Sequence, residues 1–121
     1  MAYRLANAAW CMLLLYAVAV QYNDPDPVRW MFAYGVGAAF AGYAAAAGAV
    51  PIVPPLVWAA IASVAAIGDF AYGSGQTDPM GGFPHWGRLR DEIVRETLGL
   101  LLMAGWMVVL AWWTRRRQTT P

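Results

Sequence analysis

The stretch QYNDPDP, residues 21–27, decides how the chain folds, because it separates two long apolar runs. Residues 6–20 before it are apolar except for Asn7, and residues 30–50 after it carry no charge. A segment with two acids and two prolines cannot lie in hydrocarbon, where charges and unpaired backbone groups are costly. The sequence therefore predicts a turn at one face of a membrane, joining two membrane-spanning helices.

The composition of the whole chain supports a membrane location. Of the 121 residues, 60% are hydrophobic and 12% are charged, against about 25% charged in an ordinary soluble domain. A soluble core of this size would leave too much apolar surface in water. The net charge of +1 implies no nucleic-acid partner. Abundant Ala, with Arg as the only strongly basic residue, is typical of a GC-rich genome. We therefore expect a bacterial inner-membrane protein in contact with the lipid bilayer.

Four stretches are long and apolar enough to cross a bilayer, which takes about 20 residues. They are residues 3–21, 28–50, 55–72 and 93–113. The prediction is an all-α membrane protein, a single domain over residues 1–121 folded as a four-transmembrane-helix bundle. The first stretch extends to Val20, close to spanning length, so we expect a retained helix and not a cleaved signal peptide.

The connections between these helices differ in character. Residues 51–55 form a short uncharged link, which predicts a tight turn between the second and third helices. Residues 73–91 are rich in Gly, Pro and Asp, and are longer than the usual 2–8 residues of a bundle loop. We expect this long outer loop to be a lid or a surface for a partner.

Orientation follows from the arginines near the helix ends. Four spans place both termini on one side, with Arg4 and the block 115–117 and no acid. The opposite side carries four further arginines and most of the acids, so Arg counts alone are tied. Because the terminal block is compact and acids contribute little to the rule, both termini are predicted to be cytoplasmic. The acidic side then faces the exterior.

Two further patterns concern packing and the membrane surface. The second helix carries small residues at three- and four-residue spacing, predicting close packing against a neighbouring helix: Gly35, Ala38, Ala39, Gly42, Ala45 and Ala46. Several aromatic residues fall near the predicted membrane interfaces, where such rings prefer to lie: Tyr22, Trp30, Tyr72, Trp86, Trp112 and Trp113.

Polar residues cluster at the outer ends of the predicted helices. Because these ends are neighbours in a four-helix bundle, the residues are expected to converge on one site. The set comprises Gln21, Asn23, Asp24, Asp26, Asp69, Glu92, Arg95 and Glu96. Several carboxylates with an amide suit a hard divalent cation such as calcium, magnesium or manganese. The predicted metal ligands are Asp24, Asp26, Asp69, Glu92 and Glu96.

The same residues have structural interpretations, and these remain open. Asp24 and Asp26 can cap the second helix. An acid at Glu92 complements the N-terminal end of the fourth helix. Arg95 can neutralise Asp69 or Asp24 in a structural ion pair. No spacing in the chain matches a known calcium-binding loop.

Other chemistries have few candidate residues. The single cysteine, Cys11, lies in the first apolar run and is expected to be a buried small hydrophobe. A single histidine, His85, excludes bis-histidine haem ligation within the chain. There is no nucleophile elbow, phosphate-binding loop or Cys-x-x-Cys motif, so no catalytic residue is assigned.

The segment 21–26, followed by Trp30 and Tyr34, and later Arg95-Glu96 with Gly99 and Trp106, resembles the transmembrane-protein-220 family. The resemblance covers the first two helices and the fourth. It implies a small multipass membrane protein and highlights the polar residues without assigning them a reaction.

Two functions follow as hypotheses. The first is a non-catalytic accessory subunit packed against other subunits of a larger membrane complex of respiratory or photosynthetic type. The small size, the small-residue helix face and the long loop favour it. The second is a protein that binds a cation or small polar ligand at the outer carboxylate cluster, with enzymatic chemistry left open.

Overall fold

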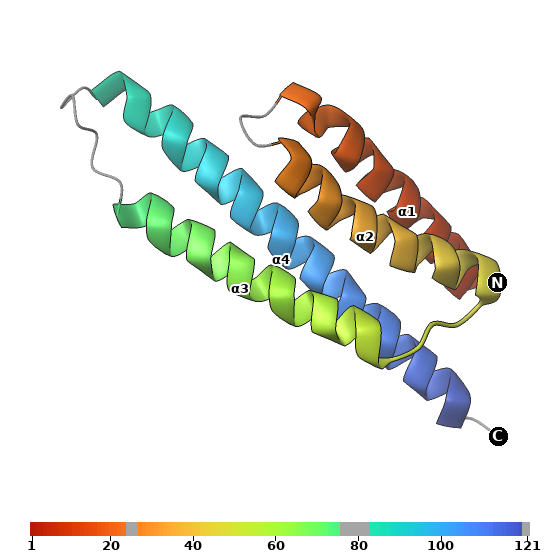
Figure 1. The fold of residues 1–121 in the computed structure, drawn as a ribbon. Helices are drawn as coiled ribbons and strands as arrows, with labels where there is room; N and C mark the ends of the chain where they lie inside the picture. The colour runs from red at the N-terminus through yellow and green to blue at the C-terminus, as the bar shows by residue number, and fades with distance from the viewer. Residues whose placement is uncertain (24–26, 76–82, 120–121) are drawn as a thin grey trace.

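The computed structural model describes the backbone of residues 1–23, 27–75 and 83–119, and the side chains of residues 1–22, 27–71 and 94–119. It contains α1 (Ala2–Val20), a short 3-10 turn η1 (Gln21–Asn23), α2 (Pro27–Ala47), α3 (Val53–Gly75) and α4 (Phe83–Thr119). Consecutive helices run in opposite directions, and both chain termini lie at one end of the molecule (Figure 1). We call this the terminal end, and the end at η1 the turn end.

The helices form two antiparallel hairpins, α1 with α2 and α3 with α4, and α4 lies against the first hairpin (Figure 1). α3 and α4 extend beyond the α1–α2 connection at the turn end. With 37 residues, α4 is about 55 Å long at 1.5 Å per residue. That exceeds the roughly 30 Å hydrocarbon core of a bilayer, so α4 continues past the membrane core.

The helix bounds differ from the predicted ones in a way that hydropathy explains. The long loop expected over residues 73–91 is wrong at both edges, because α3 continues to Gly75 and α4 already begins at Phe83. Hydropathy marks only the apolar part of a helix, while polar turns continue it, and a proline such as Pro84 is tolerated in a first turn. α2 ends at Ala47, since Gly48 has a φ of 82° and its N–H bonds to the Ala44 carbonyl at 2.9 Å.

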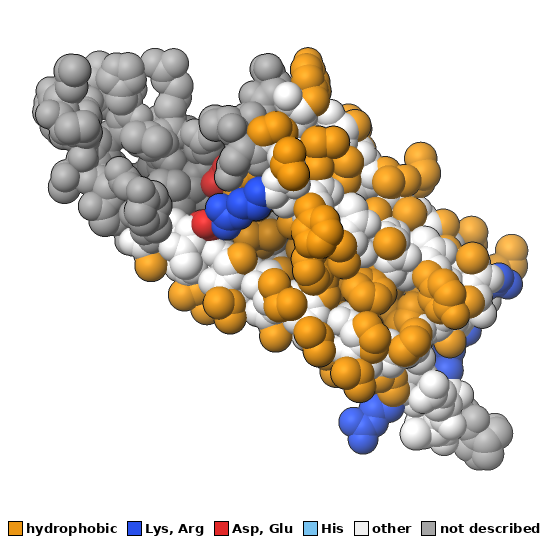
Figure 2. Space-filling model, in the orientation of Figure 1, with side chains coloured by type: hydrophobic (Ala, Val, Ile, Leu, Met, Phe, Trp, Pro, Cys, Tyr) orange, Lys and Arg blue, Asp and Glu red, His pale blue; other side chains and the backbone are white. Residues whose placement is uncertain are grey.

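Three helical segments within the described residues are long and apolar enough to cross a membrane: Ala2–Val20, Val53–Ala71 and Val94–Thr119. The fourth helix of the predicted bundle, α2, is not among them. Its sequence includes a charge at Arg29 and several Gly, Tyr and Trp residues, which lower its mean hydropathy. Exposed apolar side chains cover the middle of the visible face, and charged ones lie toward its ends (Figure 2). The protein is an all-helical membrane protein.

The face that α2 buries overlaps the predicted small-residue stripe only in part. The buried residues of α2 are Trp30, Tyr34, Gly37, Ala38, Ala41 and Ala44. Of the predicted stripe, Ala38 is buried and a Cβ on Gly42 would meet the Cys11 sulfur of α1 at 3.3 Å, while Ala39 and Ala46 are exposed and a Cβ on Gly35 would meet nothing within 4 Å. The reason is that α2 and α4 pack large side chains of one helix against glycines of the other: Met103 of α4 lies against Gly37 of α2, and Tyr34 of α2 lies against Gly99 of α4. A Cβ on Gly37 would meet the Met103 sulfur at 2.8 Å.

A buried polar layer joins α1 to α4. The Asn7 side chain is fully buried, donates from Nδ2 to the Tyr3 carbonyl at 2.9 Å, and accepts from the Trp106 indole N–H at 3.2 Å. The Tyr3 and Thr114 hydroxyls, both fully buried, are 3.1 Å apart. Trp10 stacks on Trp106 with ring centroids 4.7 Å apart. These contacts explain the one polar residue in the first apolar run, because a buried polar group must find partners.

Candidate ligand site

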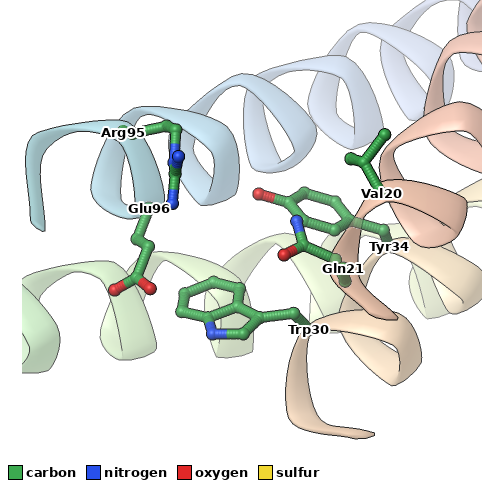
Figure 3. A pocket seen from close by; sticks show the side chains of 6 residues that line it. All are labelled: Val20, Gln21, Trp30, Tyr34, Arg95 and Glu96. Carbon is green, nitrogen blue, oxygen red and sulfur yellow. The ribbon is translucent and has the colours of Figure 1, made fainter. Parts of the chain in front are cut away.

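A cavity of about 190 Å³ lies at the turn end of the bundle, where α1, α2 and α4 meet. The end of α1 and the start of η1 supply two of its side chains, the first turns of α2 supply two, and α4 supplies two. They are Val20, Gln21, Trp30, Tyr34, Arg95 and Glu96 (Figure 3). We call this cavity the polar pocket. It combines a cation, an anion, an amide and a phenol in a bundle that is otherwise mainly apolar.

The aromatic wall of the polar pocket comes from one face of α2. Trp30 and Tyr34 are one helical turn apart and stack with ring centroids 6.2 Å apart. Their exposed fractions are 2% and 7%. The Tyr34 hydroxyl lies where a Cβ on Gly99 would be, so only glycine at this place in α4 leaves room for the ring. Gly99 therefore sets the position of the phenol in the pocket.

The polar groups of the pocket come from separate helices. In Figure 3 the Tyr34 hydroxyl points toward the Arg95 side chain, and the Gln21 amide lies beside the Tyr34 ring. Gln21 is the C-cap of α1, in a helical conformation, and its backbone N–H bonds to the Val18 carbonyl. Since Arg95 and Glu96 are consecutive on α4, their side chains leave the helix in different directions and present opposite charges to different parts of the pocket.

An ion pair between α2 and α3 lies next to Trp30, one of the residues that line the pocket. The Arg29 Nη2 atom lies 2.7 Å from both carboxylate oxygens of Asp69. The same guanidinium lies 5.0 Å from the Trp30 ring centroid, within cation–π range. Of the two partners considered for Arg95, Asp69 is bound by Arg29, because the first turn of α2 passes beside the outer part of α3, and Asp24 lies outside the described residues. The pair fixes both α3 and the indole that lines the pocket.

Comparison with known protein families shows which family the chain belongs to. The sequence profile described as "Transmembrane family 220, helix" matches residues 13–112. The chain belongs to transmembrane family 220. The predicted resemblance is confirmed, and the matched region contains every residue that lines the polar pocket. No protein with a curated description and no solved structure matches the chain.

The structure brings together part of the cluster that the sequence predicts in this family 220 protein. Gln21, Arg95 and Glu96 line the polar pocket, and Asp69 is linked to it through Arg29 and Trp30. The side chains of four further members lie outside the described residues: Asn23, Asp24, Asp26 and Glu92. Among the side chains that are described, no three Asp, Glu, His or Cys residues come close enough to hold a metal ion. The metal site therefore stays a prediction.

Sequence reasoning gave Arg29 and the two pocket aromatics no part in the site. The sequence predicts Trp30 at the membrane interface, whereas its indole is almost fully buried. The available signal was their spacing. Trp30 and Tyr34 share a helix face immediately after the polar turn, so they extend inward from the same end as Gln21.

Proposed function

We propose that this family 220 protein binds a small polar molecule in the polar pocket. The observation that carries the proposal is the convergence of Gln21, Arg95 and Glu96 with two buried aromatic rings on one cavity. Ionisable side chains at membrane depth are costly, so they are placed where they serve a partner or a ligand. Concave sites with aromatic walls and a few convergent polar groups are typical of small-molecule binding.

The size and charges of the pocket suggest the class of ligand. A volume of about 190 Å³ corresponds to roughly six water molecules at about 30 Å³ each. Arg95 suits an acidic group, because a guanidinium binds carboxylate or phosphate with paired hydrogen bonds. Glu96 suits a donor or a positive charge, and the Trp30 face suits a cation or carbon skeleton. A small zwitterion of amino-acid type meets all three requirements.

The proposed setting is a four-span bundle in a bacterial inner membrane with both termini in the cytoplasm. All of the arginines at the terminal end, Arg4 and the block 115–117, support this orientation. α2 runs beside α1 and also contacts α4, and its residues Trp30, Tyr34 and Gly37 are buried, which supports a fourth span despite its lower hydropathy. The polar pocket then opens toward the outer face of the membrane.

A thermal-stability assay on the purified full-length protein tests ligand binding. We expect glycine to raise the unfolding temperature more than acetate or ethylammonium, since only glycine carries both charges. The Arg95→Gln and Glu96→Gln variants should each remove the glycine shift. The matched control, Arg115→Gln, removes the same charge far from the pocket and should keep it. Equal shifts in all four proteins, or none in any of them, would contradict the proposal.

A hard divalent cation is a related proposal for the same end of the bundle. Glu96 lines the polar pocket, and Asp69 lies behind it, bound by Arg29. Calcium, magnesium and manganese, each added to the protein after chelation, provide the test. A stabilisation that Glu96→Gln abolishes and Arg95→Gln leaves intact would favour a cation site over a zwitterion site.

A second proposed role is that of a non-catalytic accessory subunit in a larger membrane complex of respiratory or photosynthetic type. One observation favours it. The uncovered face of α2 carries Gly35, Ala39 and Ala46, and α2 is not among the helical segments apolar enough by themselves to cross a membrane. Small residues allow another helix to approach closely in a membrane. Gentle extraction and native mass spectrometry test this role, because it requires stoichiometric foreign subunits. A particle of this chain alone would contradict it.

A further inference from the structure

A second recess, at the terminal end of α4, is separate from the polar pocket. Its volume is about 500 Å³, and its lining residues all lie on one face of α4 at three- and four-residue spacing. They are Val109, Trp112, Trp113, Arg116 and Arg117. We propose that this recess binds the phosphate headgroup of an anionic phospholipid.

The two guanidinium groups are held in place by aromatic rings. Arg116 lies 4.1 Å from the Trp112 ring centroid, and Arg117 lies 4.7 Å from the Tyr3 ring centroid. Tyr3 is fully buried and meets Trp113 edge-on at 5.0 Å, so the second arginine rests on a rigid support. A guanidinium stacked by its face still directs its N–H groups outward in the ring plane, where they match phosphate oxygens.

The electrostatic surroundings favour an anion. Residues 1–23 and 97–121 contain no Asp or Glu, so the charged side chains of these segments are all arginines. Basic side chains gather at this end in the space-filling view (Figure 2). The acidic residues whose side chains the structure describes, Asp69 on α3 and Glu96 on α4, lie toward the turn end.

The apolar side chains beside the arginines favour a lipid over free phosphate. Trp112 is 51% exposed and lies one helical turn from Arg116. Val109 is 39% exposed and lies about two turns from the arginines, and both are in the membrane-spanning part of α4. A headgroup bound at Arg116 and Arg117 therefore places its acyl chains along an exposed apolar helix face. Trp is also enriched at the level of the lipid headgroups.

Arg115 provides a matched control, because it carries the same charge on the same helix turn but does not line the recess. The proposed experiment uses the full-length protein, stripped of lipid in a neutral detergent. Phosphatidylglycerol or phosphatidylcholine is titrated in, and native mass spectrometry measures the fraction of protein carrying each lipid. The Arg116→Gln, Arg117→Gln and Arg115→Gln variants are compared with the wild type, with circular dichroism confirming that each remains helical.

We expect wild type to retain phosphatidylglycerol over phosphatidylcholine, and both recess variants to lose more than tenfold in phosphatidylglycerol affinity. Arg115→Gln should lose no more than the roughly fivefold expected for any basic residue near an anionic surface. If Arg117→Gln unfolds, Arg117→Lys tests the same point, because it keeps the charge without the planar stacking and should lose more than Arg115→Gln. Equal losses in all variants would overturn the proposal, as would full displacement of the lipid by inorganic phosphate at equal concentration.

Discussion

The Gly99→Ala substitution tests the packing that shapes the polar pocket. The added Cβ would fall on the Tyr34 hydroxyl and lie 3.3 Å from the ring carbon that bears it. The rigid ring or the two helices must then move, and overpacking of this kind costs about 1–3 kcal/mol. Gly105→Ala on the same helix is the matched control, because its Cβ would meet nothing within 4 Å. It should gain up to about 1 kcal/mol from helix propensity.

Subtracting the two variants removes the shared propensity gain and isolates the overpacking cost. Unfolding by SDS titration in mixed micelles gives both free energies of unfolding, and Gly99→Ala should be less stable than Gly105→Ala by about 1–3 kcal/mol. Adding Tyr34→Phe to Gly99→Ala removes the closest atom and should recover most of that cost. Equal stabilities for the two alanine variants, or no recovery in the double variant, would refute the close contact between α2 and α4.

Three further predictions concern the other helix contacts and the topology. Tyr3→Phe and Thr114→Val should each destabilise the protein. A double-mutant cycle of their free energies of unfolding should give an interaction energy of about 0.6 kcal/mol, and at most about 1.7 kcal/mol. A double-mutant cycle of Arg29→Gln and Asp69→Asn should give an interaction energy of about 1 kcal/mol or less, since the arginine side chain is 49% exposed. A cysteine added after the C-terminus of a Cys11→Ala protein should react with an impermeant reagent only in inverted vesicles; reaction in intact cells would reverse the orientation.

The sequence is sufficient to predict a helical membrane protein, because long apolar runs of this kind can satisfy their backbone hydrogen bonds in a membrane as helices. As predicted, the polar stretch separates two helices, since α1 ends at Val20 and α2 begins at Pro27. The helix ends were less predictable. The start of α4 at Phe83 lies in a polar segment, where hydropathy has no signal, and helix formation there depends on propensity and capping. The end of α2 is set by the positive φ of Gly48, a feature that the sequence alone allows but does not require.

The sequence predicts which residue types form the candidate site and at which end of the bundle they lie, but it does not predict which charged side chains form ion pairs. The polar residues at the turn end include Gln21, Arg95 and Glu96, and the pocket contains all three. The partner of Asp69 could not be predicted, because two arginines were available and only the rotation of α2 decides between them. The same rotation explains why only part of the predicted small-residue stripe is covered by neighbouring helices. Alanine is tolerated equally well against lipid and against a helix, so the pattern does not fix the buried side.

The most direct test of the polar pocket is the native mass of the protein as extracted from its own membrane. We predict that wild type carries a small non-covalent adduct, which Arg95→Gln loses and Arg115→Gln keeps. The adduct should be compatible with a cavity of about 190 Å³. If neither wild type nor Arg95→Gln carries an adduct, a ligand site formed by α1, α2 and α4 would be contradicted.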